Sequence, residues 1–233
     1  MRQRKCEMGL QLTVIRPTWT PMIRKSLATL LLSLLLPAFS TVAAAQPLTI
    51  LALGDSLTAG YGLEPAAAFP VRLEAALRAK GIDAVVLNAG VSGDTVAQGA
   101  ARLDWSLSDD VNAVIVELGA NDALRGLDPA QAEAALRQIT DTLGKRKLPV
   151  LLAGMRAPPN MGPEYVAVFE GMYSRTAAHA GALLYPFFLD GVAADPALNQ
   201  GDGLHPTAAG VDVIVARILP SVEALLAQVQ KQP

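Results

Sequence analysis

The sequence is poor in the residues that hold metals and form disulfides. It contains one cysteine, Cys6, and two histidines, His179 and His205. We expect Cys6 to be removed with the N-terminal segment, which leaves a chain without a thiol. Such a chain has no disulfide framework, no cysteine-ligated metal and no cysteine nucleophile.

The N-terminal segment holds an uncharged run that is rich in leucine. The ten residues Leu27–Leu36 carry no charge and include seven leucines, and the basic pair Arg24 and Lys25 stands before them. Three alanines, 43–45, follow. A basic start, a short apolar run and small residues at the end describe a secretory signal peptide. We therefore predict cleavage between Ala45 and Gln46 and a periplasmic or secreted protein.

Whether the segment is cleaved and where translation starts both have alternative interpretations. Residues 27–45 are just long enough to cross a bilayer, so an uncleaved anchor is the rival hypothesis, although polar residues in the second half favour cleavage. Met22 opens an ordinary signal peptide by itself, and we interpret residues 1–21 as an extension ahead of the true start. The predicted organisation is a signal peptide with extension, 1–45, followed by one globular domain, 46–233.

An excess of positive charge is also missing. Residues 1–45 hold six of the 19 Lys and Arg residues and one of the 21 Asp and Glu residues. Cleavage would leave 13 basic and 20 acidic residues, a net charge of −7. Because phosphate binding needs a basic patch, nucleic acid is not expected as a partner.

Strand-like and helix-like patterns alternate after residue 46. The expected strands are 49–53, 84–87, 111–118, 150–153 and 183–187, and the expected helices are 69–80, 95–107, 129–147, 163–180 and 207–229. This alternation predicts an α/β fold, a parallel sheet with helices on both faces. The long, mostly apolar run 111–118 predicts a strand buried on both faces. Glu117 near its end is either a structural carboxylate, the role that we favour, or a residue beside the site.

Three polar segments follow the first three expected strands. They are Gly54-Asp-Ser56, Ser92-Gly-Asp94 and Gly119-Ala-Asn-Asp122. Because parallel strands end at one edge of a sheet, these segments should converge where ligands bind in such folds. Each segment alone also has the composition of an ordinary turn.

A serine nucleophile needs a base, and the sequence offers two histidines. His179 lies in an expected helix without an acid nearby in sequence, so we interpret it as a surface or packing residue. His205 follows Asp202 by three residues, a spacing that lets the carboxylate reach the imidazole of its own loop. Ser56, His205 and Asp202 are therefore the candidate catalytic residues; the alternative for the last two is a helix N-cap region.

Acyl transfer also needs donors for an oxyanion. The candidates are the backbone N–H groups of Ser56 and Gly93 and the side-chain amide of Asn121. Glycine allows close approach of the backbone to a ligand, whereas asparagine after a strand-end glycine is also a common turn residue.

These four segments resemble the blocks of the SGNH (GDSL-type) hydrolase family, and the match covers most of residues 47–228. The matching blocks are Gly54-Asp-Ser-Leu57, Asn88-Ala-Gly-Val-Ser-Gly-Asp-Thr95, Gly119-Ala-Asn-Asp122 and Asp202-Gly-Leu-His-Pro206. The resemblance implies a flavodoxin-like three-layer α/β/α sandwich with a five-stranded parallel sheet and no metal or cofactor. It assigns the nucleophile to Ser56, the triad partners to His205 and Asp202, and oxyanion donation to Gly93 and Asn121.

The branch most similar is the bacterial periplasmic thioesterase, lysophospholipase and arylesterase group, through segments 123–127, 155–160 and 185–188. We therefore expect an exported serine esterase acting on small acyl esters or thioesters, without a stable membrane anchor after cleavage. The candidate substrate-binding residues are Leu124, Leu127, Met161 and Phe188, which could equally belong to the core. A carbohydrate O-acetylesterase and a non-catalytic binding protein on the same scaffold are the alternatives.

Overall fold

The structure, a computed structural model, describes residues 46–231. The predicted signal peptide, its cleavage site at Ala45 and the proposed start at Met22 lie outside the described residues. Across residues 46–231, none of the helices has the length and apolar character needed to cross a membrane.

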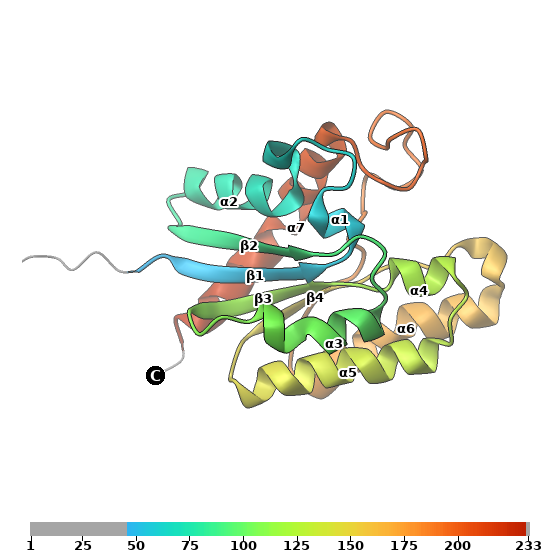
Figure 1. The fold of residues 1–233 in the computed structure, drawn as a ribbon, viewed down its shortest axis with the longest axis horizontal. Coiled ribbons are helices and arrows are strands. Elements are labelled where there is room, and N and C mark those ends of the chain that lie inside the picture. Colours follow the sequence, from blue (N-terminus) through green and yellow to red (C-terminus); the bar gives the residue numbers. More distant parts are fainter. Residues whose placement is uncertain (1–45, 232–233) are drawn as a thin grey trace, which may run out of the picture. The chain divides into compact units, whose positions relative to one another are not determined.

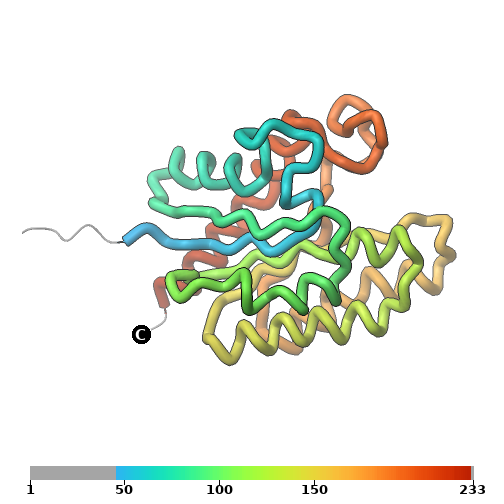
Figure 2. Tube along the Cα trace, viewed as in Figure 1, coloured from blue at the N-terminus to red at the C-terminus, as the bar shows by residue number. Residues whose placement is uncertain are grey.

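Five parallel strands form one sheet with the spatial order β2-β1-β3-β4-β5 (Figure 1). The strands are β1 (Leu48–Gly54), β2 (Ala84–Gly90), β3 (Val111–Glu117), β4 (Val150–Ala153) and β5 (Leu183–Tyr185). This is the flavodoxin-like order, in which ligands bind beyond the carboxyl ends of β1 and β3, where the direction of the connections reverses. The tube in Figure 2 shows the chain leaving β1, β2 and β3 at one end of the sheet.

Helices cover both faces of the sheet and give three layers (Figure 1). The helices α2 and α7 pack together on one face, and α3, α5 and α6 pack on the other. The longer helices are α2 (Phe69–Ala79), α3 (Val96–Ser106), α5 (Pro129–Lys145), α6 (Pro163–Ala180) and α7 (Ala208–Val229). The short elements are α1 (Ser56–Ala59), α4 (Ala120–Leu124) and the 3₁₀ turns η1 (Pro65–Ala67) and η2 (Pro159–Met161).

Local sequence signals explain where the helices start. Thr95 caps α3 and forms a reciprocal capping box with Gln98, which satisfies two backbone N–H groups. Asp128 caps α5, and Pro129 occupies its first position, where a missing N–H costs nothing. The expected elements are all present, with ends that differ by up to three residues. The largest change is in β2, which continues through Asn88–Gly90 because these residues pair with the end of β1.

The core lies on both sides of the two central strands. In β1 and β3 nearly every residue is buried, which confirms that β3 is covered on both faces. Val114, Ile115 and Val116 are at most 1% exposed. The register sets Gly54 at the end of β1 beside Glu117 at the end of β3. A completely buried carboxylate therefore lies directly under the edge where the polar loops meet.

Candidate active site

Ser56 is the first residue of the one-turn helix α1, immediately after β1. Asp55 caps this turn, because its Oδ1 accepts a hydrogen bond from the Leu57 backbone N–H at 3.0 Å. Gly54 must be a glycine, since a Cβ there would collide with Thr58 Oγ1 and press on the Glu117 carboxylate. This tight turn from strand to helix presents the Ser56 hydroxyl at the sheet edge.

His205 and Asp202 form a compact pair in the loop before α7. Asp202 Oδ2 lies 2.6 Å from His205 Nδ1, and Asp202 Oδ1 accepts from the backbone N–H groups of Leu204 and His205 at 2.9 and 3.0 Å. The hydrogen bond from the His205 backbone, followed by those from its ring and from the Leu204 N–H, holds the pKa of the Asp202 carboxyl well below its usual range. Asp202 is therefore ionised at neutral pH.

The pair is aligned with the serine. His205 Nε2 lies 2.9 Å from Ser56 Oγ, although the two residues are 149 positions apart in the chain. With its proton on Nδ1, the imidazole donates to Asp202 and accepts the Ser56 O–H. The ring of Tyr61 packs on the imidazole with 4.5 Å between ring centres and covers it on one side. The three predicted catalytic residues are thus brought together in one hydrogen-bonded row.

Asn121 and Gly93 lie on neighbouring loops of the same edge. Asn121 Nδ2 is 3.1 Å from Asp55 Oδ2 and 3.0 Å from the Asp94 carbonyl oxygen, so both N–H bonds of the amide have protein acceptors. Gly93 has a φ of 89°, a left-handed conformation that favours glycine, and its carbonyl accepts from Arg125 Nη2 at 2.7 Å. Asn121 lines the cavity beside Ser56, whereas Gly93 lies in an adjacent turn.

Two buried carboxyl groups sit beneath the serine. Burial raises the pKa of Asp55 to about 6, against hydrogen bonds from Leu57 and Asn121 that favour its charged form. Burial, and then the nearby Asp55 charge, raise the pKa of Glu117 well above its usual range. Glu117 Oε2 accepts from Thr58 Oγ1 at 2.8 Å, while its Oε1 has no partner. Because two adjacent buried charges repel, Glu117 keeps its proton to a higher pH than Asp55 does.

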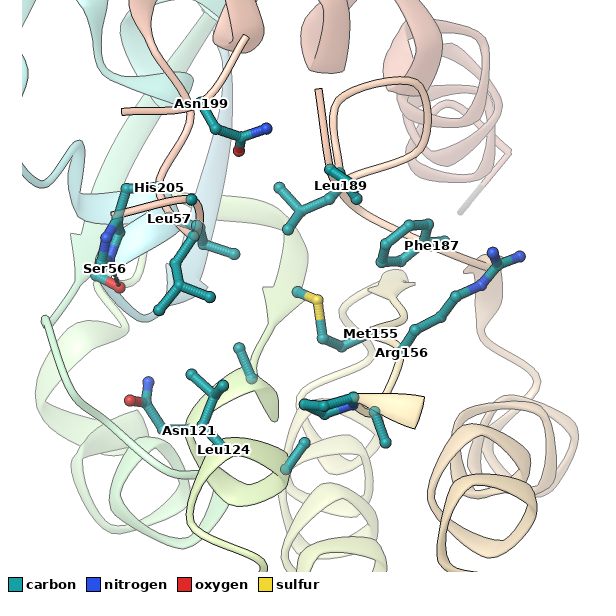
Figure 3. A pocket seen from close by; sticks show the side chains of 18 residues that line it. Ser56, Leu57, Asn121, Leu124, Met155, Arg156, Phe187, Leu189, Asn199 and His205 are labelled. Carbon is teal, nitrogen blue, oxygen red and sulfur yellow. Dashed lines mark hydrogen bonds between the residues drawn. The ribbon is translucent and has the colours of Figure 1, made fainter. Parts of the chain in front are cut away.

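An apolar cavity of about 240 Å³ opens beside Ser56 (Figure 3). Ser56 and His205 lie at one end of the cavity, and Phe187 and Arg156 at the other. Most of the wall between these ends is apolar. Its apolar residues are Leu57, Ala120, Ala123, Leu124, Met155, Ala157, Pro158, Phe187, Leu189, Ala193, Ala194 and Leu204.

The structure places the four candidate substrate-binding residues differently. Leu124 lines the cavity and is 51% exposed. Leu127 and Met161 lie outside its lining; the Leu127 carbonyl accepts from the Tyr165 hydroxyl, and Met161 belongs to η2 near Gly126.

Phe188 lies in the core rather than in the cavity. It is fully buried and packs edge-on against Phe69 at 5.0 Å, whereas its neighbours Phe187 and Leu189 line the cavity. Phe187–Asp190 form a turn after β5, in which Phe187 and Leu189 face the cavity and Phe188 faces the core. For Phe188 the core alternative therefore holds, and its two neighbours in the sequence contact the cavity.

The segment after β4 contributes residues that the sequence did not single out for the site. Met155, Arg156 and Ala157 line the cavity. Their position directly beyond a strand of the parallel sheet is the signal that could have found them, because every such strand ends at the ligand-binding edge. His179, by contrast, lies on α6 with 46% of its side chain exposed and its Nε2 3.3 Å from Asp141 Oδ1. Throughout the described residues, no cluster of His, Cys, Asp and Glu could hold a metal ion.

The doubly wound sheet and the aligned Ser56, His205 and Asp202 at its carboxyl edge are the features of a serine hydrolase. Comparison with known proteins narrows this class. The GDSL-like Lipase/Acylhydrolase family matches residues 52–213. The chain belongs to this family, the SGNH hydrolases, and is a serine hydrolase acting on ester bonds.

Similar proteins carry consistent names. The chain is 40% identical to "Esterase TesA" of Pseudomonas aeruginosa over 79% of this chain and 91% of that protein. It is 41% identical to "Thioesterase 1/protease 1/lysophospholipase L1" of Escherichia coli K12 over 71% of this chain and 79% of that protein. Among solved structures, AlinE4, described as an SGNH-hydrolase family esterase, is 49% identical and covers 77% of this chain and 97% of its own, with a TM-score of 0.65.

Proposed function

We propose that the protein is an exported esterase that hydrolyses small acyl esters and thioesters through a Ser56–His205–Asp202 triad. The observation that carries the proposal is the continuous row from Asp202 Oδ2 to His205 Nδ1 at 2.6 Å and from His205 Nε2 to Ser56 Oγ at 2.9 Å. These distances fall in the range needed for proton transfer between nucleophile and base.

The reaction has two halves. Ser56 Oγ attacks the acyl carbonyl while His205 takes the hydroxyl proton, and the alcohol or thiol leaves with that proton. A water molecule then attacks the acyl-enzyme, His205 takes one of its protons and returns it to Ser56, and the free acid departs. The ionised Asp202 holds the ring in the useful tautomer and stabilises the imidazolium.

The oxyanion formed in each half needs donors. We assign this role to the backbone N–H groups of Ser56 and Gly93 and to Asn121 Nδ2. The amide donates to Asp55 and to the Asp94 carbonyl in the structure, so it must share one of these hydrogen bonds with the oxyanion. Asp55 and the Asp94 carbonyl fix the amide in place before substrate arrives, which is the preorganisation that such a donor requires.

The apolar lining of the cavity supports acyl chains rather than sugars as the group that it holds. A rate series over p-nitrophenyl esters from acetate to octanoate tests this assignment. We expect the octanoate to have the higher kcat/KM. A preference for acetate would instead favour the carbohydrate O-acetylesterase alternative.

The triad is tested by p-nitrophenyl butyrate hydrolysis with the purified protein and three variants. Ser56→Ala and His205→Gln should fall to background. His179→Gln is the matched control, because it removes the other histidine, which lies exposed on α6. Activity of Ser56→Ala equal to wild type would remove Ser56 from the mechanism.

Export rests on the basic, leucine-rich and alanine-rich pattern of residues 24–45. Mass spectrometry of protein recovered from outside the cytoplasm should show a chain that begins at Gln46. An intact leader on that protein would favour the anchor instead, and a precursor that begins at Met1 would exclude a start at Met22.

A further inference from the structure

The cavity beside Ser56 has a second polar end that the proposed reaction does not use. Arg156 lies there, three residues after the end of β4, and Figure 3 shows it across the cavity from Ser56. Its guanidinium carbon is 4.7 Å from the centre of the Phe187 ring. The ring holds the guanidinium by a cation–π contact, and Arg156 is otherwise exposed.

The guanidinium has no anionic partner within the described residues. Other arginines there are matched, such as Arg102 with Asp94 at 2.6 Å and Arg175 with Glu133 at 2.6 Å. Asp190, which follows Phe187 by three positions, is held by Arg217 at 2.6 Å. Across residues 46–231, no ion pair or hydrogen bond joins the Arg156 guanidinium to another group.

The wall between the two ends is apolar, as Leu57, Met155 and Leu189 illustrate. A ligand that contacts both ends therefore has a reactive carbonyl at one end, a hydrocarbon chain in the middle and an anion at the other end. A planar guanidinium with free N–H groups matches a carboxylate, which it binds by two parallel hydrogen bonds.

The anion could be attached through the acyl chain or through the leaving group. The acyl group stays bonded to Ser56, whereas the leaving group departs and water takes its place. The apolar cavity, which encloses its occupant, therefore suits the acyl group. We propose that Arg156 is a specificity residue that binds the terminal carboxylate of an ω-carboxyacyl group. The substrates are then half-esters of linear dicarboxylic acids, and water converts them to the free diacid and the alcohol. This inference rests on the proposed function of Ser56.

The test compares two esters of equal chain length, p-nitrophenyl hydrogen suberate and p-nitrophenyl octanoate. They differ only in the terminal carboxylate. In Arg156→Gln, the kcat/KM for the suberate should fall by about 5- to 10-fold, mainly through KM, because a partly exposed ion pair in good geometry is worth about that much. The octanoate should change less than twofold, which also shows that the variant is folded.

Two further variants separate local from general charge effects. Arg156→Lys keeps the charge but loses the planar fork, so it should recover only part of the suberate rate. Arg146→Gln removes the same charge at the far end of α5, where Arg146 pairs with Asp104, and should leave both rates unchanged. Adipate and sebacate half-esters complete the series, and the preference for the carboxylate should peak at one chain length.

The outcomes are distinct. An unchanged suberate-to-octanoate ratio in Arg156→Gln, or no turnover of any half-ester by wild type, overturns the inference while octanoate hydrolysis leaves the esterase intact. A loss on 4-(octanoyloxy)benzenesulfonate, whose anion is on the leaving group, without a loss on the suberate also overturns it. Octanoate hydrolysis that survives Ser56→Ala contradicts the proposed function instead.

Discussion

The raised pKa of the buried Glu117 beneath the active site makes the stability of the fold fall as the pH rises. The side chain is completely buried, and burial together with the Asp55 charge raises its pKa. The folded protein therefore keeps a proton that the unfolded chain gives up above about pH 4.3. Because the folded state binds more protons, the free energy of unfolding falls as the pH rises through the window between the unfolded and folded pKa values.

The magnitude follows from this linkage. While the pH stays below the folded pKa, retaining one proton costs about 1.4 kcal/mol per pH unit. The cost therefore grows with each pH unit between the pKa of the unfolded chain and the raised pKa of the folded Glu117. Glu117→Gln keeps the shape of the neutral acid and an acceptor for Thr58 Oγ1, but it does not titrate. The free energy of unfolding of the variant should therefore rise relative to wild type as the pH increases from 5 to 7, by up to about 1.4 kcal/mol per pH unit.

Urea unfolding at pH 5, 6 and 7 measures this difference. Circular dichroism is the suitable probe, because Trp105 is 93% exposed and its fluorescence would change little. Glu133→Gln is the matched control, because the pKa of Glu133 is shifted in the opposite direction. A hydrogen bond from Arg175 lowers this pKa, so the charged Glu133 stabilises the fold fully above pH 5. That variant should be destabilised equally at all three values. A stability difference between Glu117→Gln and wild type that stays constant from pH 5 to 7 would refute the assignment of a retained proton.

Three further outcomes are expected. Asn121→Ala should lower kcat by about 10²–10³ with a smaller effect on KM, measured with p-nitrophenyl butyrate, because the donor acts on the oxyanion; an effect confined to KM would contradict this role. Asp202→Asn should cost on the order of 10⁴ in kcat, while Asp141→Asn beside His179 should cost nothing, and near wild-type turnover of the former would remove it from the triad. Gly54→Ala should destabilise the fold by about 1–3 kcal/mol or more in thermal unfolding, because its Cβ collides with Thr58; a melting temperature within one degree of wild type would show that the turn relaxes freely.

The sequence predicted the strands and the long helices because their signals are local. An apolar run such as Ala113–Val116 marks a buried strand, and Asp128-Pro129 marks a helix start without any knowledge of the rest of the chain. The one-turn helices α1 and α4 escaped prediction, since four or five residues are too few to show a helical period. The order of the strands also escaped, because it depends on contacts between segments far apart in the chain.

In the candidate site, too, some residues could be predicted from the sequence and others could not. Ser56, Asp202 and His205 were found because their residue types carry the chemistry, and the structure places them in one row. The cavity wall was harder to predict. Phe187 and Phe188 are the same residue type, so the sequence does not distinguish them. Only the path of the chain after β5 decides which ring faces the core and which faces the cavity.

The turn that joins Asp202 to His205 makes the acid and the base a self-contained unit. Asp202 binds the backbone of the residues it precedes as well as the ring of His205, so these contacts lie within four consecutive positions. A movement of the loop therefore carries both groups together and leaves their mutual geometry intact. Such a movement changes the separation between His205 Nε2 and Ser56 Oγ and the contact between the imidazole and the Tyr61 ring. A change in the length of the loop between β5 and this turn therefore alters how His205 meets Ser56 and leaves the Asp202–His205 pair intact. A loop exchange that restores the distance between His205 and Ser56 restores the hydrogen-bonded row.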